Sequence, residues 1–127
     1  MAQADSSNKR KGDRSMSLGF IAQYAAEACL QTPGVYKLEH SPVAAFKESF
    51  GVHHEWEGVE VRFLPDREDA VEITCYPYLL FGVMVPEVAW QIQVNVKADV
   101  ERYTGLDVEA VNVYVKDIVS EEETHEN

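Results

Sequence analysis

One stretch of the sequence constrains the fold more than any other, because its pattern fits both a strand and a helix. The stretch covers residues 84–115 and reads MVPEVAWQIQVNVKADVERYTGLDVEAVNVYV. Its middle, WQIQVNVK, alternates apolar and polar residues as a half-buried strand does. The same stretch opens with Pro-Glu and closes with Thr-Gly, as a helix would. The choice between them decides whether Trp90 and Val94 belong to the core or to the surface.

The helical interpretation accounts for more of this stretch. Apolar residues recur at helical steps over five turns, whereas the strand alternation fails at residues 98–100. Gly105 suits the left-handed position that follows the last turn of a helix. We therefore predict a long helix ending before Gly105, with a core stripe made of Val85, Val88, Ala89, Ile92, Val96, Val100 and Tyr103.

Trp90 and Val94 then project from the side of the helix roughly opposite to that stripe. The sequence leaves two outcomes open for them. They are covered by another part of the chain, such as residues 42–50, or they are presented to a partner. If exposed, a Trp beside a β-branched residue is the kind of anchor that supplies about 2 kcal/mol or more of interface energy.

The remaining elements are shorter. We expect a helix capped by Ser15 or Ser17 that ends before Pro33-Gly34, a strand over 35–39 and a short helix over 41–51. Alternating runs over 59–63 and 71–75 predict an antiparallel hairpin, and a last strand covers 111–116. Pro77 lacks an amide donor, so we expect the far end of the second hairpin strand at a sheet edge or bulge.

These elements predict an α+β domain with two layers, in which helices pack on one face of a small, mainly antiparallel sheet. At 127 residues, with 46% hydrophobic and 26% charged residues, the chain fits one soluble globular domain. We expect a disordered basic tail over 1–15, the domain over 16–118 and a disordered acidic tail over 119–127.

Charge is unevenly distributed along the chain and bears on the class of partner. The net charge is −11, of which residues 1–15 carry +2, residues 117–127 carry −5 and the part between them carries −8. A folded body of that sign repels phosphates, so we expect no nucleic-acid partner. The basic tail could touch an anionic surface, although such tails are more often only solubilising.

The sheet offers a second candidate surface. Tyr76 and Tyr114, with Tyr78 near them, alternate outward with polar residues of the strands. Such a face is either a solvated sheet surface or a site for self-association or a partner.

Metal-ligand chemistry is concentrated in one stretch. If it is extended, His53, Glu55 and Glu57 share one side, and imidazole with carboxylates suits zinc or copper. A hydrophilic loop explains the same residues. We expect no cofactor.

Catalytic signatures are missing from the sequence. There is no glycine-rich phosphate loop, no nucleophile elbow and no cysteine in an electropositive turn, so we expect no enzyme and no catalytic residue. Cys29 and Cys75 lie in apolar segments and are expected to be reduced core thiols of a cytoplasmic protein. The longest apolar run, residues 78–85, is far shorter than the roughly 20 residues of a membrane span.

The sequence resembles the alkaline shock protein (Gls-type) family of bacterial envelope stress response proteins. The likeness covers roughly residues 18–118. Two short motifs, Thr-Pro-Gly-Val at 32–35 and Gly-Val-Glu-Val at 58–61, belong to it, whereas the basic tail and residues 39–57 depart from the family pattern. The most specific matches lie in the opening stretch: Pro86, Glu87, Val88, Ala89, Val96, Thr104, Gly105, Leu106, Val111, Asn112 and Val113.

The resemblance implies a non-enzymatic cytoplasmic protein of the envelope or alkaline stress response and of cell-envelope homeostasis. Such a protein acts by protein–protein interaction or self-assembly. Its partners are further copies of itself or an envelope-associated protein, and it lies near the membrane only through an anchoring partner. The alternative function is metal binding or metal response through His53, Glu55 and Glu57.

Overall fold

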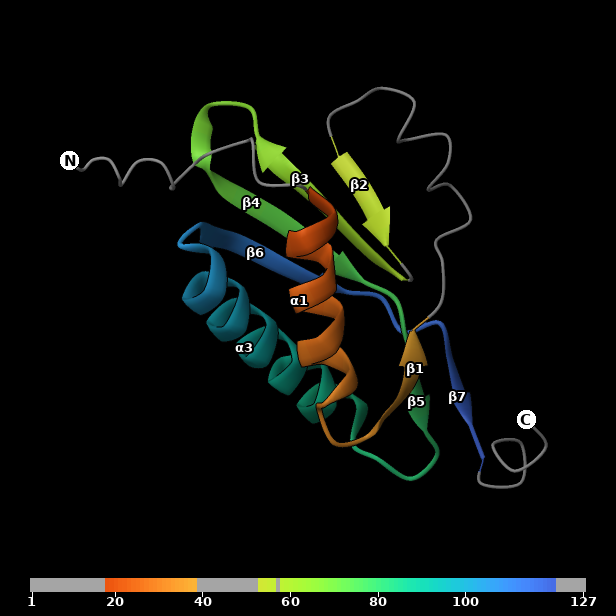
Figure 1. Ribbon diagram of the computed structural model, residues 1–127. Coiled ribbons are helices and arrows are strands. Elements are labelled where there is room, and N and C mark those ends of the chain that lie inside the picture. The colour runs from red at the N-terminus through yellow and green to blue at the C-terminus, as the bar shows by residue number, and fades with distance from the viewer. Residues whose placement is uncertain (1–17, 39–52, 57, 121–127) are drawn as a thin grey trace.

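The fold is defined by a computed structural model that describes residues 18–38, 53–56 and 58–120 (Figure 1). The expected helix over 41–51 and the caps Ser15 and Ser17 lie outside these residues. The elements follow in this order: α1 (Leu18–Leu30), β1 (Val35–Leu38), β2 (His53–Trp56), β3 (Val59–Leu64), β4 (Arg67–Cys75), β5 (Pro77–Leu80), α3 (Val85–Thr104), β6 (Asp107–Val113) and β7 (Asp117–Val119).

The ambiguous stretch is a helix. Proline stands in the first turn of α3, and Gly105 after the last turn adopts φ 77°, with its amide donating to the Glu101 carbonyl at 3.0 Å. Only a residue without a Cβ takes that backbone conformation at little cost. The core stripe is narrower than expected, because Val85 and Tyr103 are exposed. The buried residues of α3 are Val88, Ile92, Val96, Val100 and Thr104.

The strands form two sheets where one was expected. A four-stranded sheet has the order β2-β3-β4-β6, and a three-stranded sheet has the order β1-β5-β7. The expected hairpin is present as β3 and β4, but the last strand of each sheet pairs in parallel, β6 with β4 and β7 with β5. A parallel neighbour requires a crossover connection, and α3 supplies it between β4 and β6. The fold is thus α+β, with mixed sheets.

Pro77 marks the place where the chain changes sheets. It is buried and begins β5, the central strand of the three-stranded sheet, so the expected position at an edge or bulge of the hairpin strand is wrong. At the first residue of a strand the missing donor costs no ladder hydrogen bond. The Pro77 carbonyl still accepts from the Lys116 amide at 2.8 Å.

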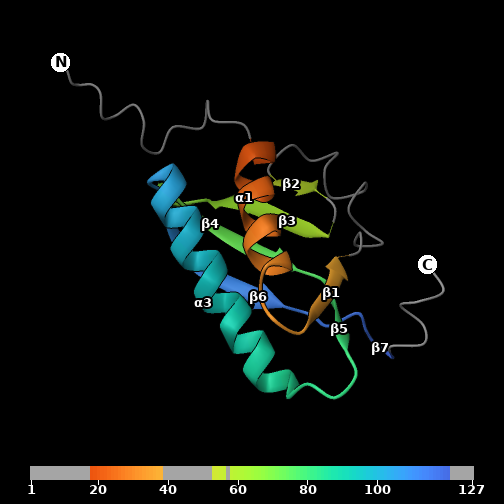
Figure 2. The ribbon, with the colours of Figure 1, turned by 60° about the horizontal axis from the view of Figure 1, so that its bottom comes forward.

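Both helices cover the same side of the sheets (Figures 1 and 2). The small side chains Ala22, Ala25 and Ala26 of α1 are fully buried, which lets the helix approach the sheet closely. Cys29 and Cys75 are buried free thiols in this core. None of the helices in the described ranges has the length and apolar character needed to cross a membrane.

The turn after α1 is held tightly against α3. Gly34 has φ +98°, and a Cβ built there would lie 3.0 Å from Cγ2 of Val88 and 3.3 Å from Cγ1 of Val83. On the same seam, the Asn95 amide donates to the Thr32 hydroxyl at 2.9 Å. These contacts fix the start of α3 beside the α1–β1 turn.

A pair of matched substitutions tests the helical assignment. Val96→Ala removes two buried methyl groups and leaves a cavity, so we expect it to lower the free energy of unfolding by about 2–3 kcal/mol. Val94→Ala removes the same atoms from the outward side of α3 and should cost less than about 1 kcal/mol. Urea denaturation of both variants gives the comparison, and equal losses would contradict the assignment.

Candidate functional site

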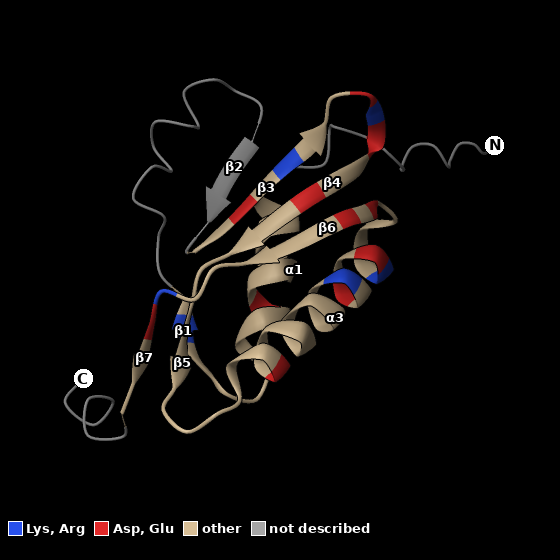
Figure 3. Ribbon diagram, turned by 180° about the vertical axis from the view of Figure 1, so that it is seen from behind, with Lys and Arg blue, Asp and Glu red and all other residues tan. Residues whose placement is uncertain are grey.

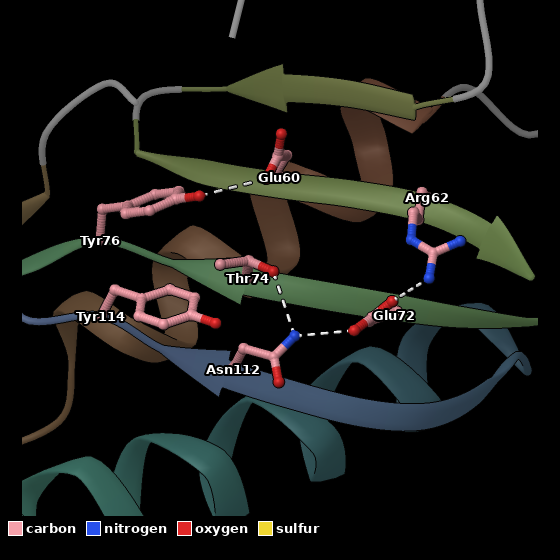
Figure 4. Close-up of a pocket in the computed structure, with 7 residues that line it drawn as sticks. All are labelled: Glu60, Arg62, Glu72, Thr74, Tyr76, Asn112 and Tyr114. Carbon is pink, nitrogen blue, oxygen red and sulfur yellow. Dashed lines mark hydrogen bonds and ion pairs between the residues drawn. The ribbon is translucent and has the colours of Figure 1, made fainter. Parts of the chain in front are cut away.

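The side of the four-stranded sheet that faces away from the helices is open. Figure 3 views the molecule from this side, with α1 and α3 behind the strands. Side chains of β3, β4 and β6, with the residues that follow β4 and β6, line a shallow hollow of about 430 Å³ there, which we call the sheet hollow. The side chains around it are shown in Figure 4: Glu60, Arg62, Glu72, Thr74, Tyr76, Asn112 and Tyr114.

Strand register brings these side chains together. In the β3–β4 pair, Glu60 is opposite Thr74 and Arg62 is opposite Glu72, and in the β4–β6 pair Thr74 is opposite Asn112. Directly opposed residues project from the same face of a sheet. These polar side chains of three strands therefore form a single patch, in which Glu60 is itself buried, at 8% exposure.

Glu72 links two neighbouring side chains of the sheet hollow. Its carboxylate accepts a hydrogen bond from the Asn112 amide at 2.8 Å and forms an ion pair with Arg62. The hydrogen bond from Asn112 is the largest influence on the Glu72 pKa, and with the Arg62 charge it outweighs partial burial, so that the pKa lies below its usual value. Glu72 consequently stays ionised and holds both neighbours in place.

Two tyrosines form the other end of the sheet hollow. The Tyr76 and Tyr114 rings stack with centroids 5.9 Å apart and planes 24° from parallel. The Tyr76 hydroxyl donates to the Glu60 carboxylate at 3.2 Å. Tyr114 is 59% exposed and so presents ring surface to an incoming group. The combination of carboxylate, aromatic ring and amide suits the binding of a charged or polar side chain.

The outward side of α3 is the second candidate surface. Trp90 is 61% exposed and Val94 is 39% exposed. Trp90 also lines a hollow of about 410 Å³ with Pro33, Glu87, Val88 and Gln91. Whether residues 42–50 cover Trp90 lies outside the described residues.

The structure adds apolar residues that sequence periodicity did not single out. Phe81 and Met84, in the loop between β5 and α3, are 78% and 63% exposed. This loop adjoins the α1–β1 turn, because the amide of Leu80 donates to the Gly34 carbonyl at 2.9 Å. The signal in the sequence was the run FGVM, whose apolar residues follow a strand without belonging to a strand or a helix. We call the surface formed by Pro33, Phe81, Met84, Val85, Trp90 and Val94 the Trp90 surface.

The stretch that carries metal-ligand chemistry in the sequence is described only in its backbone, as part of β2. His53 and Glu55 lie in β2, in register with Arg62 and Glu60, but their side chains and Glu57 are outside what the structure describes. Among the described residues, no three His, Cys, Asp or Glu side chains are grouped closely enough to hold a metal ion.

Fold and surfaces together define a small α+β domain with helices on one face of its main sheet and an open polar, aromatic hollow on the other. Comparison with known proteins gives its family. The chain belongs to the alkaline shock protein 23 (ASP23) family, described as having a cell envelope-related function, whose profile matches residues 6–120. The resemblance seen in the sequence is thereby confirmed.

Two relatives and one solved structure illustrate what this chain is similar to. An uncharacterized Streptococcus pyogenes serotype M6 protein, Spy1535, is 36% identical over 95 residues, which is 74% of this chain and 69% of the relative. The uncharacterized Bacillus subtilis protein YqhY is 26% identical over 95 residues, 75% of this chain and 68% of its own. A manganese form of the MamM CTD has a TM-score of 0.48 at 15% identity, covering 80% of this chain and 99% of that one, a likeness too distant to bear on metal binding or function.

The lowered pKa of Glu72 predicts a pH dependence of stability. Because its pKa is lower in the folded state than in the unfolded chain, the stabilisation is present above the unfolded value and is lost as pH falls through the folded pKa. Glu72→Gln should therefore lower the free energy of unfolding by about 1 kcal/mol at neutral pH and by less near pH 3. Urea titrations at the two pH values measure the difference.

Asn112→Ala provides the companion measurement. It removes the main hydrogen-bond donor to Glu72, so the Glu72 pKa should rise toward its usual value in an NMR titration. An unchanged Glu72 titration, or an equal effect of Glu72→Gln at both pH values, would contradict the described geometry.

Proposed function

We propose that this protein serves the cell envelope by binding other proteins, either further copies of itself or an envelope-associated protein, and that it is not an enzyme. The exposure of Trp90 on a rigid helix carries the proposal. On this proposal the protein lies in the cytoplasm and acts in the envelope or alkaline stress response. It reaches the membrane through an anchoring partner. Membership of a family with a cell envelope-related function supports it.

The Trp90 surface has the properties of a protein-binding surface. Trp90 stands on α3, whose neighbouring turns are fixed by fully buried Ile92 and Val96, so a partner would meet a preordered aromatic side chain. The adjacent hollow between Trp90 and Pro33 gives a partner side chain a place to enter. Tryptophan anchors beside such hollows supply a large share of the binding energy in many interfaces.

Three of the exposed apolar residues, Phe81, Met84 and Val85, lie close together in the β5–α3 loop and at the first residue of α3. Monomeric proteins seldom leave several large apolar side chains exposed together unless the patch is functional. Figure 3 shows that the β5–α3 loop and the start of α3 carry only one charged residue, Glu87. An interface core with few charges is typical of stable protein contacts.

A protein partner fits this surface better than a lipid surface does. None of the residues that form the Trp90 surface is Lys or Arg, and the chain as a whole carries a net charge of −11. Attachment to the cytoplasmic leaflet usually depends on basic residues that meet anionic lipids. We therefore place any membrane contact in the anchoring partner.

Crosslinking and affinity capture from the native cell, joined with light scattering of the purified protein, test this function. Trp90→Ala should lose a captured partner or lower the solution mass, since truncation of a central anchor typically costs about 2 kcal/mol or more. Phe20→Ala is the matched control, because Phe20 is an equally exposed aromatic residue, at the start of α1. Unchanged mass and unchanged partners for Trp90→Ala would overturn the role of this surface.

A further inference from the structure

We propose that the sheet hollow is a docking site for basic side chains and that its occupant is the segment 9–14 of the same chain. The segment contributes Lys9, Arg10, Lys11 and Arg14, four of the 11 basic residues of the protein. The inference does not depend on the proposed function, because the sheet hollow and the Trp90 surface are lined by different residues.

The lining of the sheet hollow matches a guanidinium or ammonium group. Glu60 supplies a largely buried carboxylate, to which the Tyr76 hydroxyl donates, and the exposed ring of Tyr114 stacks on the Tyr76 ring in the same patch (Figure 4). A cation held over a tyrosine ring is attracted by the ring's negative face. The protein makes this contact elsewhere, because the Lys37 ammonium lies 4.9 Å from the centroid of the Tyr78 ring.

Charge complementarity selects a basic occupant. The open face and its rim carry more carboxylates than basic groups, as Figure 3 shows along β3, β4 and β6. Within the hollow, Glu60 and Glu72 flank the single basic residue Arg62. At the β3–β4 turn end of the sheet, Arg67 forms ion pairs with three carboxylates, those of Asp69, Asp107 and Glu109. Residues 1–15 carry a net +2 against −8 for residues 16–116. The field of the folded body therefore attracts this segment.

The segment is long enough to reach the open face. Arg10 is eight positions before Leu18, the first residue of α1, and an extended chain of eight steps spans up to about 28 Å. A helix with its side chains is only about 10–12 Å across. Because α1 packs on β2 and β3, the strands at one side of the sheet, the chain needs only to pass around that side.

Paramagnetic broadening in the 127-residue protein tests the proposal. A nitroxide is attached to ¹⁵N-labelled protein through Asn8→Cys, and the sample is diluted with protein that carries neither label, so that contacts between two spin-labelled molecules are rare. The nitroxide should weaken the amide signals of Thr74, Asn112 and Tyr114. Cys29 and Cys75 are fully buried and are not expected to react with the label. The signals should recover in about 1 M salt, where the screening length is about 3 Å. Failure of the label to weaken these signals at low salt would overturn the proposal.

Variants on both sides of the contact identify its chemistry. Replacing Lys9, Arg10, Lys11 and Arg14 by Gln changes only residues outside the described fold and should abolish the broadening. Glu60→Gln and Tyr114→Leu should each reduce it. Glu27→Gln makes the same charge change on the exposed side of α1 and should leave it unchanged. Broadening that survives the fourfold replacement, or that falls equally with Glu27→Gln, would count against the site.

A mixed sample distinguishes docking within one chain from docking between two chains. Spin-labelled protein without ¹⁵N is combined with ¹⁵N protein without the label, so that broadening reports only contacts between molecules. We expect none at low concentration. Broadening in this sample equal to that in the first would assign the occupant to a second copy and overturn docking within one chain.

Discussion

The close packing of α1 and α3 on one side of the sheets is the constraint on which the rest of the structure depends. The alanines of α1 let it approach the strands, and α3 contributes a stripe of β-branched residues that is buried along its length. Gly34 allows the chain to turn against Val88 where a Cβ would lie too close. Once α1 and α3 occupy this side, no helix of the described residues covers the other side of the four-stranded sheet.

Two surfaces with different chemistry follow from this arrangement. The Trp90 surface is apolar and extends over the β5–α3 loop and the first half of α3, a stretch in which Glu87 is the one charged residue. The sheet hollow is polar and aromatic, and its charges hold one another through Glu72, Arg62 and Asn112. An apolar surface with a tryptophan suits stable binding to a protein, whereas a charged hollow suits contacts that salt weakens. The two surfaces can therefore be engaged separately.

Much of the local structure could be predicted from residue patterns. The long helix was predicted because apolar residues at helical spacing over five turns outweigh a short strand-like alternation. The β3–β4 hairpin was predicted because apolar and polar residues alternate in two runs on either side of a turn. The exchange of sheets at Pro77 could not be predicted in the same way, because a missing donor fits an edge, a bulge or a strand start equally well. Parallel pairing of β6 with β4 was also missed, since the two strands are separated by β5 and α3.

The sequence by itself determined the class of fold, the family and the outward direction of Trp90, Tyr76 and Tyr114, because these follow from spacing within contiguous segments. Only the tertiary structure decided which residues share a surface. Asn112 and Glu72 are 40 residues apart and Asn95 and Thr32 are 63 apart, yet each pair is hydrogen-bonded. Such neighbours depend on strand register and helix docking, which arise from burying the whole core at once. Pro33 thus meets Trp90, and Tyr114 meets Tyr76, through packing that no local pattern specifies.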